Sequence, residues 1–197
     1  ALQLLEISRP DHPLQQLILQ NAPGSYQHSL QVSIMAEQAA EKLGLDPLLI
    51  RAGSLYHDVG KTSNPVFFIE NQPPGFENPH DAMAPEESAR VIISHVPEGL
   101  KIARKYRLPR RVLDFIAEHH GTTIASYQYY KAAKAVGGDE SLVDKTPYRY
   151  PGPRPQSPET AILMLADACE ARVRAERPGE DEALRALIVS VVTSRLS

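Results

Sequence analysis

This 197-residue protein has little cysteine, no long apolar run and no excess of positive charge, and each absence excludes a class of protein. A single cysteine, Cys169, excludes an internal disulfide, and we expect it to be a small buried residue in a protein from a reducing compartment. No apolar run approaches the length of a membrane span, and residues 1–9 lack a signal-peptide pattern. The formal net charge is only −3, which argues against a basic surface for polymeric nucleic acid but does not exclude a small nucleotide.

Apolar residues recur with helical spacing along nearly the whole chain. They make up 42% of the sequence, and the length suits one all-α domain over residues 1–197, without internal repeats or a β period. Because the chain is apolar from Leu2 onward, we expect it to be a domain taken from a longer protein. We predict helices over 4–19 (broken at 9–13), 25–43, 47–58, 85–96, 99–106, 109–119, 122–136, 158–175 and 182–196. Ser25, Asp46 and Ser157 are the predicted N-caps.

Two long segments rich in proline and glycine, 64–84 and 137–157, interrupt the helices. Loops of this length are often functional, and we expect both to flank a cleft and hold a nucleotide, although simple packing loops are equally consistent with the pattern. Within them, His80, Tyr150 and Arg154 are the candidate substrate contacts.

Histidine and aspartate recur in a fixed order near the predicted helices. The series is His28, the pair His57-Asp58, His95, the pair His119-His120, and Asp167. Each residue alone has an ordinary explanation: a buried core histidine, a histidine at a helix C-terminus, or Asp167 paired with Arg172 or Arg174. Together they favour a site for divalent transition metals, which prefer imidazole and carboxylate ligands. The pattern does not separate His119 from His120. We favour His119 as the ligand, with His120 binding metal or phosphate.

Asp58 is the residue best suited to join two metal ions, since a carboxylate has two oxygens whereas the adjacent imidazole of His57 binds one ion. Two ions about 4 Å apart can hold a bridging hydroxide and neutralise a phosphoryl group during in-line attack. Lys61 could contact a phosphate oxygen, and Gly60 would allow a tight turn beside the site. The residues therefore predict a two-metal phosphohydrolase with Asp58 and Lys61 as catalytic residues.

These motifs resemble the HD-domain superfamily of metal-dependent phosphohydrolases, and in particular the HD domain of the bacterial seven-transmembrane-receptor HD family. The likeness extends from about Leu4 to Arg174. It is carried by APGSYQHS (22–29), LYHDVGK (55–61), FFIENQ (67–72), NPHD (78–81), ISHV (93–96), HHGT (119–122), YPGP (150–153) and MLAD (164–167). One departure is Gln27, where relatives often have a second histidine.

The resemblance implies a catalytic domain at the cytoplasmic face of the bacterial membrane, tethered to a membrane segment outside this chain. It implies hydrolysis of cyclic di-AMP to the linear dinucleotide 5′-pApA with two divalent transition-metal ions, iron or manganese. By the same resemblance, one ion would be held by His28, His57, Asp58 and Asp167, and the other by Asp58, His95 and His119.

Two other functions stay open at this point. One is a broader nucleotide phosphohydrolase, which could include cyclic di-GMP, although the Gly-Tyr-Pro signature of that branch is absent after His119-His120. The other is a sensor that binds a cyclic dinucleotide without cutting it. The complete ligand series and Lys61 favour an enzyme over a sensor.

Overall fold

Helices form the framework of the protein in this computed structural model, which describes residues 1–196. The α-helices of that part of the chain are α1 (Leu2–Ile7), α2 (Pro13–Asn21), α3 (Pro23–Leu43), α4 (Pro47–Tyr56), α5 (Pro85–Ile93), α6 (His95–Lys105), α7 (Arg110–Glu118), α8 (Ser126–Ala135), α9 (Pro158–Glu176) and α10 (Asp181–Leu196). Short 3-10 helices are η1 (Val59–Ser63), η2 (Pro65–Phe67), η3 (Ile69–Asn71), η4 (Pro79–Ala82), η5 (Glu140–Leu142) and η6 (Thr146–Tyr148). The predicted all-α fold is confirmed.

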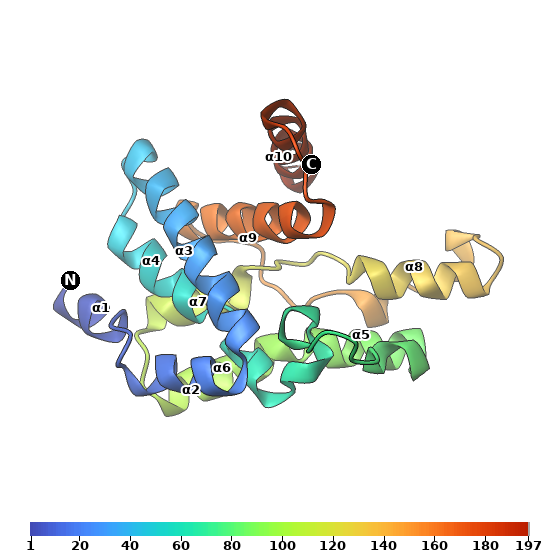
Figure 1. The fold of residues 1–197 in the computed structure, drawn as a ribbon, viewed down its shortest axis with the longest axis horizontal. Coiled ribbons are helices and arrows are strands. Elements are labelled where there is room, and N and C mark those ends of the chain that lie inside the picture. The colour runs from blue at the N-terminus through green and yellow to red at the C-terminus, as the bar shows by residue number, and fades with distance from the viewer. Residues whose placement is uncertain (197) are drawn as a thin grey trace.

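The helices that carry the candidate site pack around one apolar cluster. Figure 1 shows α3 and α4 side by side, with α7 and α9 against them. Small residues of α3, such as Ala36 and Ala40, allow the helices to approach closely, and Phe115 of α7 and Leu163 of α9 fill the space between them. These four helices therefore fix the positions of the candidate site residues that they carry or that directly follow them.

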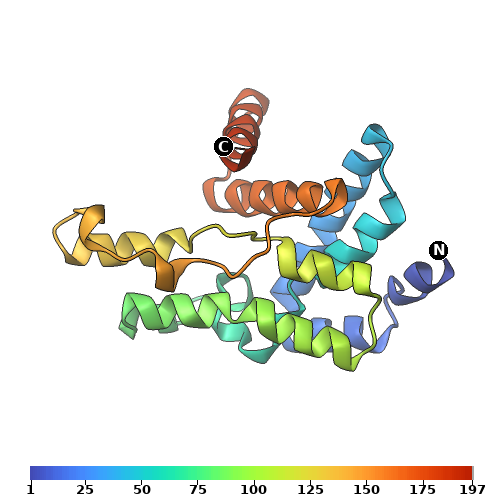
Figure 2. The same ribbon diagram turned by 180° about the vertical axis from the view of Figure 1, so that it is seen from behind.

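A second cluster lies under α5 and α8. Tyr129 of α8 packs with Tyr148 and Tyr150 of the long second loop, which returns along α8 and pairs Arg149 with Ile124 in an isolated antiparallel bridge. Figures 1 and 2 show α8 projecting from the molecule beside α5, and α10 turning away from the end of α9. In the described part of the chain, no helix is long and apolar enough to span a membrane.

Helix caps were predicted with mixed success. Asp46 accepts a hydrogen bond from the Leu49 amide, and Ser157 forms a capping box with Thr160, as predicted. Ser25 is not a cap. Helix α3 already begins at Pro23, and Ser25 is buried against the first long loop.

Two other predicted boundaries were wrong. The predicted helix 85–96 ends at Ile93, and His95 is the first residue of α6 instead of a residue of α5. The predicted helix 122–136 begins only at Ser126, because the preceding residues pair with the returning loop. Both long loops contain short 3-10 turns, so they are more regular than their composition predicts.

Candidate metal centre

The ends of three helices and the interiors of two others bring the predicted ligands together. His28 lies in α3, His57 and Asp58 follow α4, and His95 begins α6. His119 and His120 follow α7, and Asp167 lies in α9. Most of these side chains are buried, while His120 and Asp167 keep partial access to solvent. The structure thus collects the whole series at one place.

The first group surrounds one oxygen of Asp58. Its Oδ2 atom lies 3.3 Å from His57 Nε2 and 3.6 Å from His28 Nε2. Asp167 Oδ1 lies 3.0 Å from His28 Nε2 and 3.7 Å from His57 Nε2. Arg172 and Arg174, the partners considered for Asp167, instead pair with Glu176 and Glu170.

The second group surrounds the other oxygen. Asp58 Oδ1 lies 3.4 Å from His95 Nε2 and 3.5 Å from His119 Nε2, and these two nitrogens are 3.1 Å apart. His120 also has a ring nitrogen close enough to join this group. Its ring stacks on Tyr150 at 4.2 Å between centroids. Asp58 belongs to both groups, which is the geometry that a bridging carboxylate needs.

Backbone carbonyls orient three of the imidazoles. The Nδ1 atoms of His57, His95 and His119 contact the carbonyl oxygens three residues earlier at 2.6–2.9 Å. A proton on Nδ1 satisfies each carbonyl and leaves Nε2 as an electron-pair donor facing Asp58. The local turn at each helix end therefore selects the tautomer that can bind a metal ion.

Glu170, which the sequence analysis missed, orients the fourth imidazole. Its Oε2 atom lies 2.5 Å from His28 Nδ1. Glu170 follows Asp167 by three residues in α9, so both carboxylates lie on the same helix face and contact the two nitrogens of one ring. That spacing was the available signal in the sequence.

Two buried polar atoms at the centre indicate what kind of group the site can hold. Among the described residues, His57 Nε2 and Asp58 Oδ1 have no hydrogen-bond partner. Buried polar atoms without partners are rare and costly, and a cation between them would satisfy both. The donor set and its geometry therefore fit metal ions.

The charges of the centre shift its pKa values in opposite directions. Although burial favours neutral Asp58, the charges of Lys61 and His57 hold the pKa of Asp58 well below its usual range. Burial also disfavours protonation of His28, but Asp167 and Glu170 outweigh it and raise the pKa of His28 to about 8. Burial lowers the pKa of His95 to about 3, so this imidazole is neutral. The first group therefore combines carboxylates with a protonated His28, whereas burial keeps His95 of the second group neutral.

Lys61 lies deeper than expected for a residue that only contacts substrate. Its Nζ atom is 2.7 Å from both Asp58 Oδ2 and Glu70 Oε1, and it lies 5.1 Å from the centre of the Phe68 ring. Burial opposes its charge, but the two carboxylates raise the pKa of Lys61. A contact between Lys61 and phosphate stays a prediction, and Glu70 is a second residue that the sequence analysis missed.

Gly60 has a different role from the predicted tight turn. A Cβ atom there would lie 1.8 Å from the His95 carbonyl oxygen and 2.6 Å from the Gly99 amide. The missing side chain therefore allows η1 to contact the start of α6, which places Asp58 next to His95.

The remaining candidate substrate contacts lie around the centre. Tyr150 is buried against His120, and exposed Arg154 donates a hydrogen bond to Thr122 Oγ1. His80 is buried, and its ring nitrogens contact the Phe67 carbonyl oxygen and Ser88 Oγ. The contacts of His80 thus support the loop formed by residues 64–84. Substrate contacts by Tyr150, Arg154 and His80 stay predictions.

Comparison with known proteins identifies the family. The HD domain profile matches residues 25–172, and the chain belongs to the HD domain family. This confirms the resemblance inferred from the motifs.

Two curated relatives carry the same name. The chain is 42% identical over its whole length to the cyclic-di-AMP phosphodiesterase PgpH of Bacillus subtilis, and 41% identical over 98% of its length to PgpH of Listeria monocytogenes. It spans only 27% and 26% of these relatives, about a quarter of each. The crystal structure of the L. monocytogenes PgpH HD domain in complex with cyclic-di-AMP matches with a TM-score of 0.89 and 40% identity, covering 95% of this chain and 86% of that one.

Glu170 offers a test of how the centre is supported. We expect Glu170→Ala to weaken metal binding by about 10- to 100-fold, because His28 loses the group that orients its ring. Metal titration followed by fluorescence or calorimetry measures this. Glu176→Ala, in the same helix but paired with exposed Arg172, is the control and should leave metal affinity unchanged. Equal affinities for all three proteins would remove Glu170 from the metal site.

Proposed function

We propose that the protein is a metal-dependent phosphodiesterase that hydrolyses cyclic di-AMP to 5′-pApA. In this reaction, water is added across one P–O3′ bond, leaving a 5′-phosphate and a free 3′-hydroxyl. The main support is the buried carboxylate of Asp58, whose two oxygens each face a separate histidine group. The relatives named for this activity, and the matching domain crystallised with cyclic-di-AMP, support the choice of substrate.

Two divalent transition-metal ions, iron or manganese, would complete the centre. His28, His57, Asp58 and Asp167 would hold one, and Asp58, His95 and His119 the other, with His120 available beside them. When bound, such ions supply an activated water and neutralise charge on the phosphoryl group.

The chain's own residues would position the reactants. Lys61 holds Asp58 in place and offers positive charge beside it. The stacked rings of His120 and Tyr150 lie beside His95 and His119 and would border the space for substrate. Arg154 is the candidate for a more distant phosphate. In the whole protein we propose that this domain is tethered to a membrane on its cytoplasmic face.

The test is anaerobic incubation of manganese-loaded protein with cyclic di-AMP, followed by chromatography. Formation of 5′-pApA is the expected result, and the same incubation with cyclic di-GMP and with a phosphate monoester measures selectivity. Equal rates on all three would favour a broad phosphohydrolase. Binding of cyclic di-AMP without turnover would identify a sensor and refute the enzymatic proposal.

Metal binding should depend on pH. Burial opposes the charge of His57, but attraction by the carboxylates of Asp58 and Asp167 outweighs it and raises the pKa of His57 to about 10, while that of His28 is about 8. Both imidazoles are therefore protonated in the metal-free protein at neutral pH and must lose their protons when a metal ion binds. We expect metal affinity to rise as the pH increases from ~6 to ~9. Calorimetry in buffers of different ionisation enthalpy should detect proton release, and a pH-independent affinity would contradict the assignment.

A further inference from the structure

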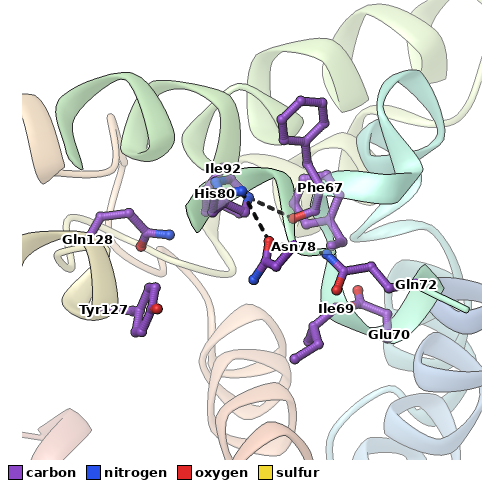
Figure 3. Close-up of a pocket in the computed structure, with 10 residues that line it drawn as sticks. Phe67, Ile69, Glu70, Gln72, Asn78, His80, Ile92, Tyr127 and Gln128 are labelled. Atoms are coloured by element: carbon purple, nitrogen blue, oxygen red, sulfur yellow. Dashed lines mark hydrogen bonds between the residues drawn. The ribbon is translucent and has the colours of Figure 1, made fainter. Parts of the chain in front are cut away.

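A cavity of about 370 Å³ adjoins the candidate metal centre, between the η2–η4 segment and the start of α8 (Figure 3). This volume is in the range of pockets that bind small molecules, roughly 300–1,000 Å³. Its walls are largely apolar, with Phe67 and Ile92 among the lining residues. None of the predicted metal ligands lines it, so it is a separate compartment.

Two residues connect the cavity to the centre. Glu70 lines the cavity and accepts the hydrogen bond of Lys61, which in turn contacts Asp58. Phe68 also lines it, and the Phe68 ring lies 5.7 Å from the His95 ring. A molecule whose phosphate lies at the metal centre could therefore extend its next group into this cavity.

Gln128 supplies an unused hydrogen-bonding group. Gln128 is only 6% exposed as a whole residue, and among the described residues its amide makes no hydrogen bond to protein. Figure 3 shows this amide pointing across the cavity toward Asn78 and His80. By contrast, Gln72 donates to the Val66 carbonyl oxygen. The amide is not fully enclosed by protein, so it can hydrogen-bond to water or to a ligand in the cavity.

The ring of Tyr127 provides a flat surface at the rim. It lines the cavity directly before Gln128 in α8, and its side chain is 55% exposed. Aromatic rings stack on nucleobases with little dependence on which base is present. The cavity therefore combines a stacking surface, apolar walls and one free amide.

We propose that this cavity binds one nucleobase of the cyclic dinucleotide, and that Gln128 selects adenine over guanine. This inference rests on the proposed function. The N6–N7 edge of adenine presents a donor beside an acceptor, which a glutamine amide matches with two hydrogen bonds. The corresponding edge of guanine presents two acceptors, O6 and N7, so the same amide can satisfy only one of them.

The experiment compares the wild-type protein with Gln128→Met, which keeps the size of the side chain but removes its hydrogen bonds. Equilibrium binding of cyclic di-AMP and cyclic di-GMP is measured by calorimetry, and turnover of each by chromatography. We expect the preference for cyclic di-AMP to fall about 10- to 100-fold, as for the loss of one bidentate base contact. Gln38→Met, an exposed glutamine of α3, is the matched control and should keep the wild-type preference.

Tyr127 gives an independent measurement. Tyr127→Ala should weaken binding of both dinucleotides similarly, whereas Tyr130→Ala, also in α8 and 65% exposed, should not. An unchanged base preference in folded Gln128→Met, while the wild type cleaves cyclic di-AMP, would overturn this inference alone. If the wild type neither bound nor cleaved either dinucleotide, the proposed function would fail first and this inference with it.

Discussion

An Asp58→Ala variant is expected to lose turnover by more than about 100-fold while keeping its helical fold. Removing groups that merely orient metal ligands typically costs 10- to 100-fold, and Asp58 is the one carboxylate shared by both histidine groups. Its loss would also leave His95 and His119 facing each other without a negative charge between them. The measurements are cyclic di-AMP turnover, metal content of the purified protein, and circular dichroism.

Asp11→Ala is the control for this substitution. Asp11 forms an exposed ion pair with Arg9, a type of pair that contributes little to stability. Asp58→Asn, which keeps the shape of the side chain, separates the loss of charge from the loss of volume. Normal turnover in either Asp58 variant would show that the chemistry does not use this centre.

A Gly60→Ala variant is expected to lose both stability and activity. The new methyl group would overlap the His95 carbonyl oxygen, and backbone atoms cannot rotate away as a side chain can. Overpacking in a well-packed interior costs about 1–3 kcal/mol or more, and relief here requires η1 and α6 to separate. We expect destabilisation of about 3 kcal/mol, measured by urea unfolding, together with reduced metal affinity because His95 moves away from Asp58.

Gly179→Ala is the matched control, because a Cβ at Gly179 meets nothing within 4 Å. It should unfold at the same urea concentration as the wild type. If Gly60→Ala retained wild-type stability and metal affinity, the close approach of η1 and α6 would not be needed for the centre.

The sequence predicted the candidate site more completely than it predicted the helix boundaries. An ordered series of histidine and aspartate residues is rare enough to stand out in a sequence, and the structure brings its members together. The break between α5 and α6 was predicted a few residues too late, at Pro97 to Gly99, because proline and glycine usually interrupt a helix. Here Pro97 lies in the first turn of α6, where a proline is tolerated.

Residues that act through others were harder to find. Glu70 and Glu170 look like ordinary surface carboxylates in the sequence, and only the packed loop and α9 show that they hold Lys61 and His28. Ser25 was assigned to the wrong role for the same reason. Its hydrogen bonds go to residues about 45 positions later, which no local pattern can reveal.

The contact between His28 and Asp167 joins residues 139 positions apart in the chain. Domains generally fold as units during synthesis, starting from the N-terminus. In this chain, α3 is the first helix that contributes a ligand, and its contact with Asp167 requires α9, which lies close to the C-terminus. A nascent chain that ends before α9 already contains all seven histidines but lacks the carboxylates of Asp167 and Glu170 that contact His28. The complete ligand set therefore exists only after α9 has been synthesised and has packed against α3, which makes the assembled centre a late product of folding.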